Sequence, residues 1–163
     1  MLIEHQGPRH YLLNALEAAP EVIEYSFRGL NDDEADFRPD PTRFTIREIV
    51  AHLADWDAIF LQRLQRTRDE NEPFLPDFDE GRLVIENNYA GSNIEEQLQL
   101  FRERRASVVD FARELSVEQW ARKCEHERAG LLTLEALATL IALHDAYHSR
   151  QIAQWRRRFA ERK

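Results

Sequence analysis

The sequence predicts an all-α protein, a four-helix bundle forming one domain over residues 1–163. In four long segments, apolar residues recur every three or four positions, which is the spacing of one helix face. The chain has only 5 Gly and 6 Pro, fewer than a sheet protein with many tight turns needs. With 43% hydrophobic and 32% charged residues, it has the composition of a folded globular domain.

The first helix is expected over residues 8–28, on an apolar face that begins at Leu12 and ends at Phe27. Pro20 interrupts this helix. Proline lacks an amide donor and its ring clashes with the preceding turn, so we expect a kink or a restart there. Residues 30–44 follow as a connection with at most one short turn of helix.

The second helix is expected over residues 45–67. Thr45 and Glu48 have the spacing of a capping box, in which the hydroxyl accepts an amide of the first turn and the carboxylate reaches back. The apolar stripe that follows indicates which side of this helix is buried, and it comprises Ile46, Ile49, Val50, Leu53, Trp56, Phe60 and Leu64.

The third helix is expected over residues 92–115, opened by a second capping box at Ser92 and Glu95. Its buried side comprises Leu98, Phe101, Arg105, Val108, Val109 and Ala112. A third capping pattern, Ser116 to Gln119, opens a short helix through Trp120. The last helix is expected over residues 133–159, with a heptad-like apolar stripe suited to a bundle seam.

Two connections are long. Residues 69–91 form a crossover of about 20 residues, which is unusual in a compact domain unless it has a function. We expect it to pack across the bundle and to help form a pocket. Residues 123–132 are a second connection. Strand-like alternation is essentially absent, although the crossover has room for a short strand pair.

The net charge disfavours two classes of partner, and the cysteine count bears on the location of the protein. With 22 Lys and Arg against 30 Asp and Glu, the formal net charge of −8 disfavours nucleic acid and anionic membranes. No apolar run approaches the roughly 18 residues of a membrane span, and the first residues lack a signal-peptide pattern. Cys124 is the single cysteine and cannot form an internal disulfide, which fits a cytoplasmic location. No nearby motif activates its thiol, so an inert cysteine is expected.

Two histidines on the last helix are the strongest chemical signal. His144 and His148 are four residues apart, so their side chains lie on one face, one turn apart. Both fall on the apolar stripe, where a buried imidazole needs a partner. A metal ion would satisfy both rings, as in metallopeptidases with this spacing. His52 lies at the margin of the apolar face of the second helix, and we expect it to point at the same interior.

Three imidazoles with no evident fourth ligand describe an open metal site, which is typical of catalytic rather than structural zinc. Imidazole binds several divalent metals. Zinc or nickel is expected first, and iron or manganese is compatible. The competing interpretation is that the helix-borne histidines bind no metal and are hydrogen-bonded in the core. Surface positions are expected for the other histidines, His5, His10 and His126.

Three polar residues stand close to these histidines in the sequence. Asp55 and Asp145 are candidates to orient an imidazole, although a solvated carboxylate is the expected state of each. Gln151 follows His148 by three positions and is a candidate to reach the site. The paired Glu-x-x-His motifs of di-iron bundles are absent, which argues against ferritin-like chemistry.

Two segments resemble the DinB-like family of damage-inducible metal-binding bundles, which is distinct from the DNA polymerase of the same name. Residues 44–56, FTIREIVAHLADW, are similar to the second helix of that family, and residues 144–152, HDAYHSRQI, are similar to its last helix. The resemblance covers most of the chain. It implies a four-helix bundle in an up-down-down-up arrangement, a metal held by His52, His144 and His148, and frequent homodimers.

The sequence departs from many family members at two positions, Tyr147, where they have His, and Arg150, where they have Gly. Related members include thiol transferases and mycothiol-dependent isomerases. The first hypothesis is therefore a metal-dependent enzyme, a thiol S-transferase or a hydrolase, acting on a small molecule, with a low-molecular-weight thiol as a candidate partner. The alternative is a non-catalytic stress-response or binding module in which the metal is structural.

Overall fold

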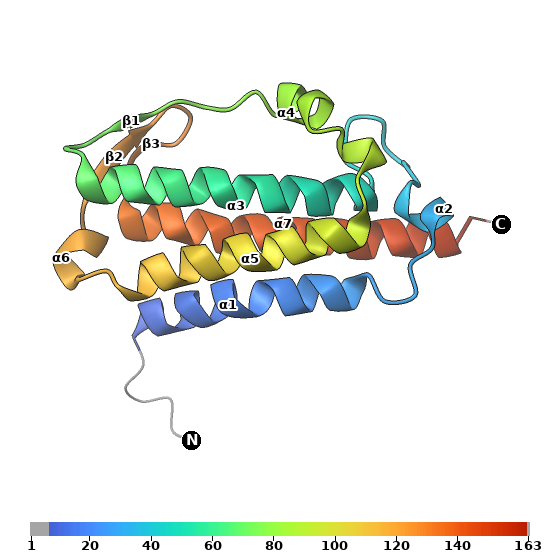
Figure 1. Ribbon diagram of the computed structural model, residues 1–163, viewed down its shortest axis with the longest axis horizontal. Coiled ribbons are helices and arrows are strands. Elements are labelled where there is room, and N and C mark those ends of the chain that lie inside the picture. Colours follow the sequence, from blue (N-terminus) through green and yellow to red (C-terminus); the bar gives the residue numbers. More distant parts are fainter. Residues whose placement is uncertain (1–6, 163) are drawn as a thin grey trace, which may run out of the picture.

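The structure of the protein, a computed structural model, describes residues 7–162 (Figure 1). Its bundle consists of α1 (Pro8–Ser26), α3 (Ile46–Asp69), α5 (Ile94–Arg113) and α7 (Leu134–Ala160). In Figure 1, α1 and α7 run in one direction and α3 and α5 in the other, which is the up-down-down-up arrangement. Helices α1 and α3 each pack against both α5 and α7. The expected four-helix bundle is confirmed.

The helix starts follow the predicted capping patterns with one exception. Thr45 and Glu48 form the capping box of α3, and a second box opens the short helix α6 (Val117–Trp120). The box predicted at Ser92 is wrong by one residue, because the side chain of Asn93 accepts the Glu96 amide at 3.1 Å and begins α5. Asparagine is at least as good an N-cap residue as serine.

Of the two outcomes expected at Pro20, a kink or a restart, the restart does not occur, because helix α1 is continuous across this residue. Because Pro20 has no amide hydrogen, the carbonyl oxygen of Leu16 loses its helical donor. Nη1 of Arg105, on α5, donates to that oxygen at 3.2 Å. A side chain from another helix thus replaces the missing bond, which sequence spacing within α1 does not reveal.

A small sheet covers one end of the bundle. Strands β2 (Lys123–His126) and β3 (Gly130–Thr133) form an antiparallel hairpin, and β1 (Phe74–Leu75) pairs with β2 in parallel. The prediction that residues 123–132 are a plain connection is therefore wrong. Each strand is too short to show a clear alternation, although Gly130 has the positive φ of 71° that suits a turn.

The crossover between α3 and α5 contains β1, α4 (Glu80–Glu86) and the 3-10 turn η1 (Tyr89–Gly91). It runs along the outside of α3 (Figure 1), and its own side chains Leu75 and Tyr89 are buried. The expectation that this segment packs across the bundle is confirmed. The earlier connection holds one turn of helix, α2 (Asp32–Ala35), as predicted.

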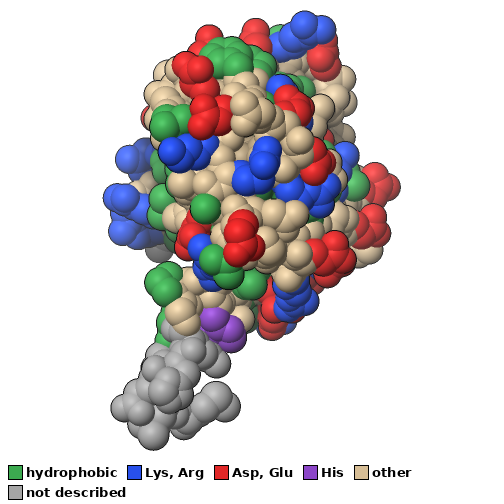
Figure 2. All heavy atoms as spheres, turned by 90° about the vertical axis from the view of Figure 1, so that its left-hand side faces the viewer, with side chains coloured by type: hydrophobic (Ala, Val, Ile, Leu, Met, Phe, Trp, Pro, Cys, Tyr) green, Lys and Arg blue, Asp and Glu red, His purple; other side chains and the backbone are tan. Residues whose placement is uncertain are grey.

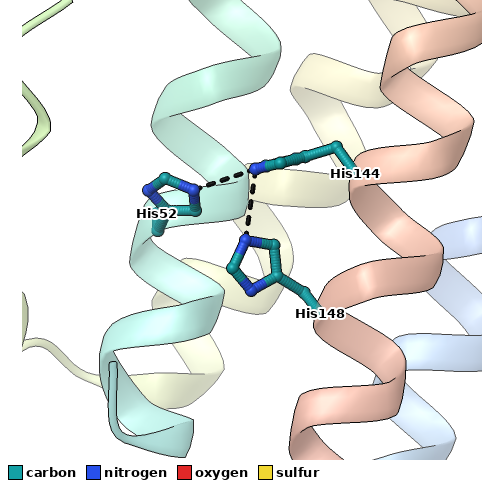
Figure 3. Close-up of side chains that lie close together, drawn as sticks. All are labelled: His52, His144 and His148. Atoms are coloured by element: carbon teal, nitrogen blue, oxygen red, sulfur yellow. Dashed lines mark hydrogen bonds between the residues drawn. The ribbon is translucent and has the colours of Figure 1, made fainter. Parts of the chain in front are cut away.

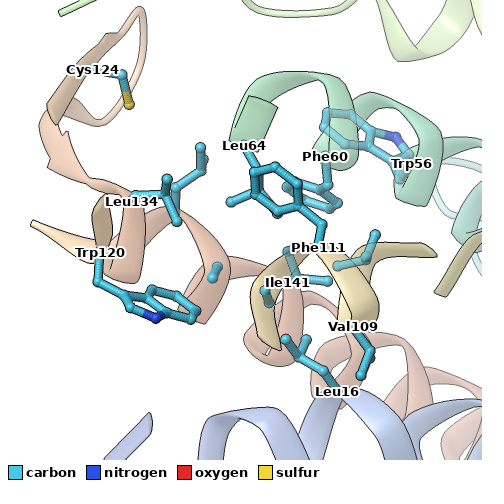
Figure 4. Close-up of a cluster of buried hydrophobic side chains, with 14 of the residues drawn as sticks. Leu16, Trp56, Phe60, Leu64, Val109, Phe111, Trp120, Cys124, Leu134 and Ile141 are labelled. Atoms are coloured by element: carbon cyan, nitrogen blue, oxygen red, sulfur yellow. The ribbon is translucent and has the colours of Figure 1, made fainter. Parts of the chain in front are cut away.

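The core is divided into two apolar clusters along the bundle axis. One lies toward α6 and the sheet and includes Leu16, Phe60, Leu64, Val109, Phe111, Trp120 and Ile141 (Figure 4). The other lies toward α2 and includes Ile23, Phe27, Ile46, Ile49, Phe101, Ile152 and Trp155. Between the clusters, the buried side chains of α5 and α7 are polar, namely Arg105, Asp145, His148 and Gln151. The rings of His52 and His144 lie beside that of His148.

No helix within residues 7–162 is both long enough and apolar enough to cross a membrane. The end of the bundle near α6 carries acidic and basic side chains mixed with small apolar areas (Figure 2). This face therefore presents no extended field of one sign to a charged partner.

Candidate metal centre

Three histidines meet in the polar layer between the two clusters. His52 comes from α3, and His144 and His148 come from successive turns of α7 (Figure 3). The capping box at Thr45 fixes where α3 begins, and the Thr133 hydroxyl, which accepts the Ala136 amide, fixes the start of α7. The positions of the three rings therefore follow from two well-defined helix starts.

The three side chains point their Nε2 atoms at a common point. Nε2 of His144 lies 2.9 Å from Nε2 of His52 and 3.2 Å from Nε2 of His148. One nitrogen from each ring falls within 4.8 Å of the others, the spacing of ligands around one metal ion. The structure thus brings together the three histidines that the sequence singles out.

Hydrogen bonds between the rings cannot satisfy all three Nε2 atoms. A neutral imidazole nitrogen offers either one N–H or one lone pair, so Nε2 of His144 can make only one hydrogen bond in the ring plane. It nevertheless faces two nitrogens. A cation that accepts a lone pair from each ring removes the conflict, and this donor set fits a divalent metal.

Burial keeps all three rings in the neutral form that a metal requires. It lowers the pKa of His144 to about 4 and that of His148 to about 3. For His52, burial is again the largest cause, and the two neighbouring histidines lower the pKa further. At neutral pH each ring therefore has a free lone pair without first having to lose a proton.

Phe44 packs against rings from both helices. Its ring centre lies 4.7 Å from that of His52 and 6.3 Å from that of His148. Its carbonyl oxygen accepts hydrogen bonds from Gln151 at 2.9 Å and from Nε1 of Trp155 at 2.8 Å. Phe44 is thereby fixed to α7 although it precedes α3, and it holds the two helices in register at the site.

Asp145 is neither an imidazole partner nor a solvated carboxylate, so the expectation for it is wrong. It is buried and accepts two hydrogen bonds from Arg105, at 2.6 and 2.9 Å. Asp57 accepts two more from the same guanidinium, both at 2.9 Å. Burial raises the pKa of Asp57 to about 6, despite the opposing charge of Arg105. We call Arg105, Asp57 and Asp145 the Arg105 triad.

Asp55 also lacks a bond to any of the three histidines. Its carboxylate accepts hydrogen bonds from the hydroxyl of Tyr89 at 2.9 Å and from Arg104 at 2.8 Å. It therefore anchors the crossover to α3 and α5 instead of standing free in solvent, as was expected.

The remaining histidines and the cysteine lie away from the centre. His126 is buried in β2 beside Arg63, so its predicted surface position is wrong. His10 is partly exposed, and its side chain contacts Asn14 and the ring of Tyr11, whereas His5 lies outside the described residues. Cys124 is buried and unpaired, and burial raises the pKa of its thiol, as expected of an inert cysteine.

Comparison with known proteins identifies the family of the chain. The sequence model of the DinB superfamily matches residues 15–152. The chain belongs to the DinB superfamily. Two relatives from Oceanobacillus iheyensis bear the names "Putative metal-dependent hydrolase OB0413" and "Putative metal-dependent hydrolase OB0782". The first is 22% identical over 139 residues, 85% of this chain and 80% of the relative. The second is 24% identical over 136 residues, 83% and 78% of the two chains.

A solved structure has the same fold as this DinB-superfamily chain. YfiT from Bacillus subtilis, described as "a probable metal-dependent hydrolase with an unusual four-helix bundle topology", superposes with a TM-score of 0.87. The match covers 98% of this chain and 93% of YfiT at 21% sequence identity. At this identity the likeness establishes the bundle and its topology.

The three histidines of this DinB-superfamily chain open into a pocket of about 230 Å³. Its other lining residues are Thr42, Arg43, Phe44, Glu80, Tyr147 and Gln151. Gln151 thus reaches the pocket, as its spacing from His148 suggested. Arg43, Phe44 and Glu80 were not anticipated. The packing of Phe44 could have been predicted from the sequence, because an apolar residue directly before an N-cap often packs back on its helix. Nothing in the sequence places Glu80 near a histidine.

Proposed function

We propose that this DinB-superfamily protein is a metal-dependent hydrolase of a small molecule, with a divalent metal bound by His52, His144 and His148. The convergence of three neutral Nε2 atoms at the wall of an accessible pocket carries the proposal. Three ligands from the chain leave at least one position for substrate or water, which is the pattern of catalytic sites. Zinc or nickel suits the donor set best, and iron or manganese is compatible.

A metal held there supplies Lewis-acid chemistry, by activating a nucleophile or by polarising a substrate carbonyl. The proton transfers belong to the chain. Glu80 is the carboxylate of the pocket wall, and partial desolvation together with the nearby charge of Asp77 raises its pKa. A carboxylate whose pKa lies closer to neutrality is a better general base and acid. Glu80 is therefore assigned to take the proton of the nucleophile and return it to the leaving group.

Metal content tests the centre directly. Protein purified without an affinity tag is analysed by elemental mass spectrometry beside two variants, His148→Ala and His126→Ala. Both remove a buried imidazole, but only His148 belongs to the cluster. We expect about one metal per chain in the wild type and in His126→Ala, and loss of the metal in His148→Ala. A wild type that takes up no zinc, nickel or manganese after reconstitution refutes the proposal.

Activity is then screened with ester, amide and lactam substrates, using chelated and reconstituted protein. Hydrolysis that chelation abolishes and metal restores supports the hydrolase. Thiol S-transfer is the second candidate, because the position left open by three histidines accepts a thiolate as readily as water. Addition of a low-molecular-weight thiol to an electrophilic substrate, detected by mass, favours that reaction. A metal-loaded protein inactive in both assays favours a binding module.

A further inference from the structure

Arg43 is a partly buried arginine without an anionic partner. Its Nε atom is buried and makes no hydrogen bond. None of the ion pairs within residues 7–162 includes it, although Glu80 lines the same pocket. A buried donor left unpaired costs free energy, so such a group in a folded protein calls for an explanation.

Aromatic rings hold Arg43 in place. Its guanidinium carbon lies 4.6 Å from the ring centre of Trp155 and 5.4 Å from that of Tyr147. The Trp155 ring is itself fixed through its hydrogen bond to the carbonyl of Phe44. Cation–π contacts of this kind orient a guanidinium without neutralising its charge. The positive charge is therefore positioned but remains available to a ligand.

Arg43 lies where two hollows adjoin. The pocket of about 230 Å³ contains the three histidines, and a second hollow of about 280 Å³ is lined by Arg43, Tyr147, Arg150 and Gln154. Arg43 and Tyr147 belong to both walls. A molecule that extends from the histidines into the second hollow thus passes Arg43. The residues that line this hollow include two arginines, Arg43 and Arg150, and no carboxylate.

We propose that Arg43 is the anion-binding residue of this pocket, and that the molecule bound at the histidines carries a carboxylate or a phosphate group that Arg43 binds. The planar guanidinium donates two parallel hydrogen bonds to either oxyanion. This inference rests on the proposed metal centre, and it names the substrate class of that centre as anionic.

The test uses hydroxamates, which bind protein-held zinc through one end and can carry a chosen group at the other. Zinc-loaded full-length protein is titrated calorimetrically with hydroxamates of increasing chain length ending in a methyl group, a carboxylate or a phosphonate. The variants are Arg43→Gln and Arg158→Gln. Arg158 also lies over the Trp155 ring, at 5.4 Å, but lines neither hollow, so its loss controls for net charge.

We expect the carboxylate or phosphonate probe of the right length to bind the wild type at least about tenfold more tightly than the methyl probe. Arg43→Gln should abolish this preference and leave the affinity for the methyl probe unchanged, whereas Arg158→Gln should retain it. The charged group that raises the affinity more, relative to the methyl probe, identifies the anion that Arg43 binds. Equal affinities in the wild type, or a preference that survives Arg43→Gln, overturn the inference and leave the metal centre standing. If the zinc-treated wild type retains no zinc and binds no hydroxamate, the metal centre itself is refuted, and the anion site with it.

Discussion

Arg105 donates a hydrogen bond to the carbonyl oxygen of Leu16, the carbonyl that Pro20 deprives of its helical donor. The same guanidinium binds Asp57 on α3 and Asp145 on α7. One side chain of α5 therefore joins all four long helices. Because Asp145 directly follows His144, this junction and the histidine centre share one level of the bundle, between the two apolar clusters.

Arg105→Met is expected to lower the free energy of unfolding by about 3–5 kcal/mol, because it leaves two buried carboxylates without their cation. Urea denaturation followed by circular dichroism measures the change. Arg113→Met is the matched control on the same helix, since Arg113 pairs with Glu17 while both remain about half exposed. The free energy of unfolding should fall by less than about 1 kcal/mol in Arg113→Met. Similar losses in the two variants would show that the triad contributes no more than a surface pair.

The stability of the metal-free protein should fall as the pH is lowered from about 6.5 to about 4, through protonation of His144. Burial lowers the pKa of His144 from 6.5 to about 4. In this window the unfolded chain binds a proton that the folded chain does not, so acid favours unfolding. Between about pH 7.5 and about pH 5, His144 alone should account for a loss on the order of 2 kcal/mol.

Titration of Asp57 changes the stability with pH in the opposite direction, so its contribution must be separated from that of His144. Its pKa is raised to about 6, so the folded state holds a proton that the unfolded chain has released, and its contribution weakens as pH rises from about 4 to about 6. The informative quantity is therefore the difference between wild type and His144→Gln at each pH. A pH dependence that is the same in both proteins contradicts the assigned pKa of His144.

The sequence was sufficient for features that depend on local spacing. The four long helices, two of the capping boxes and the shared face of His144 and His148 all follow from helical periodicity. Arg105 also fell on the buried side of its predicted helix. Its partners could not be found in the same way, because Asp57 and Asp145 lie 48 and 40 residues away along the chain.

The missed parts of the pocket have the same physical origin. Arg43 and Glu80 lie in connections, where no periodicity indicates which way a side chain points, and they reach the histidines only through the packing of those connections. The β2–β3 hairpin was missed because four residues per strand are too few for alternation to stand out. The inward side chain of His126 was consequently expected at the surface.

Cys124 should resist thiol reagents in the folded protein. Its side chain is fully buried, and burial raises the pKa of the thiol, so both access and the thiolate fraction are low. We expect Ellman's reagent to react with the native protein only at the rate at which the chain opens, and to react rapidly in concentrated urea. Arg105→Met, which destabilises the fold without touching the sheet, should speed the native reaction. Rapid labelling of the native wild type contradicts the buried position of Cys124.

Glu80→Gln tests the assignment of the proton-transfer role. If Glu80 is the general base of the hydrolase, its amide replacement should lower kcat by about 10²–10⁴-fold and leave the metal content unchanged. The acid limb of the pH–rate profile should disappear as well, because that limb reports the pKa of the base. Glu86→Gln is the control on the same helix, since Glu86 pairs with Arg82 and does not line the histidine pocket. A kcat that is unchanged in Glu80→Gln excludes this carboxylate from the proton transfers, because loss of a general base must slow the step that it catalyses.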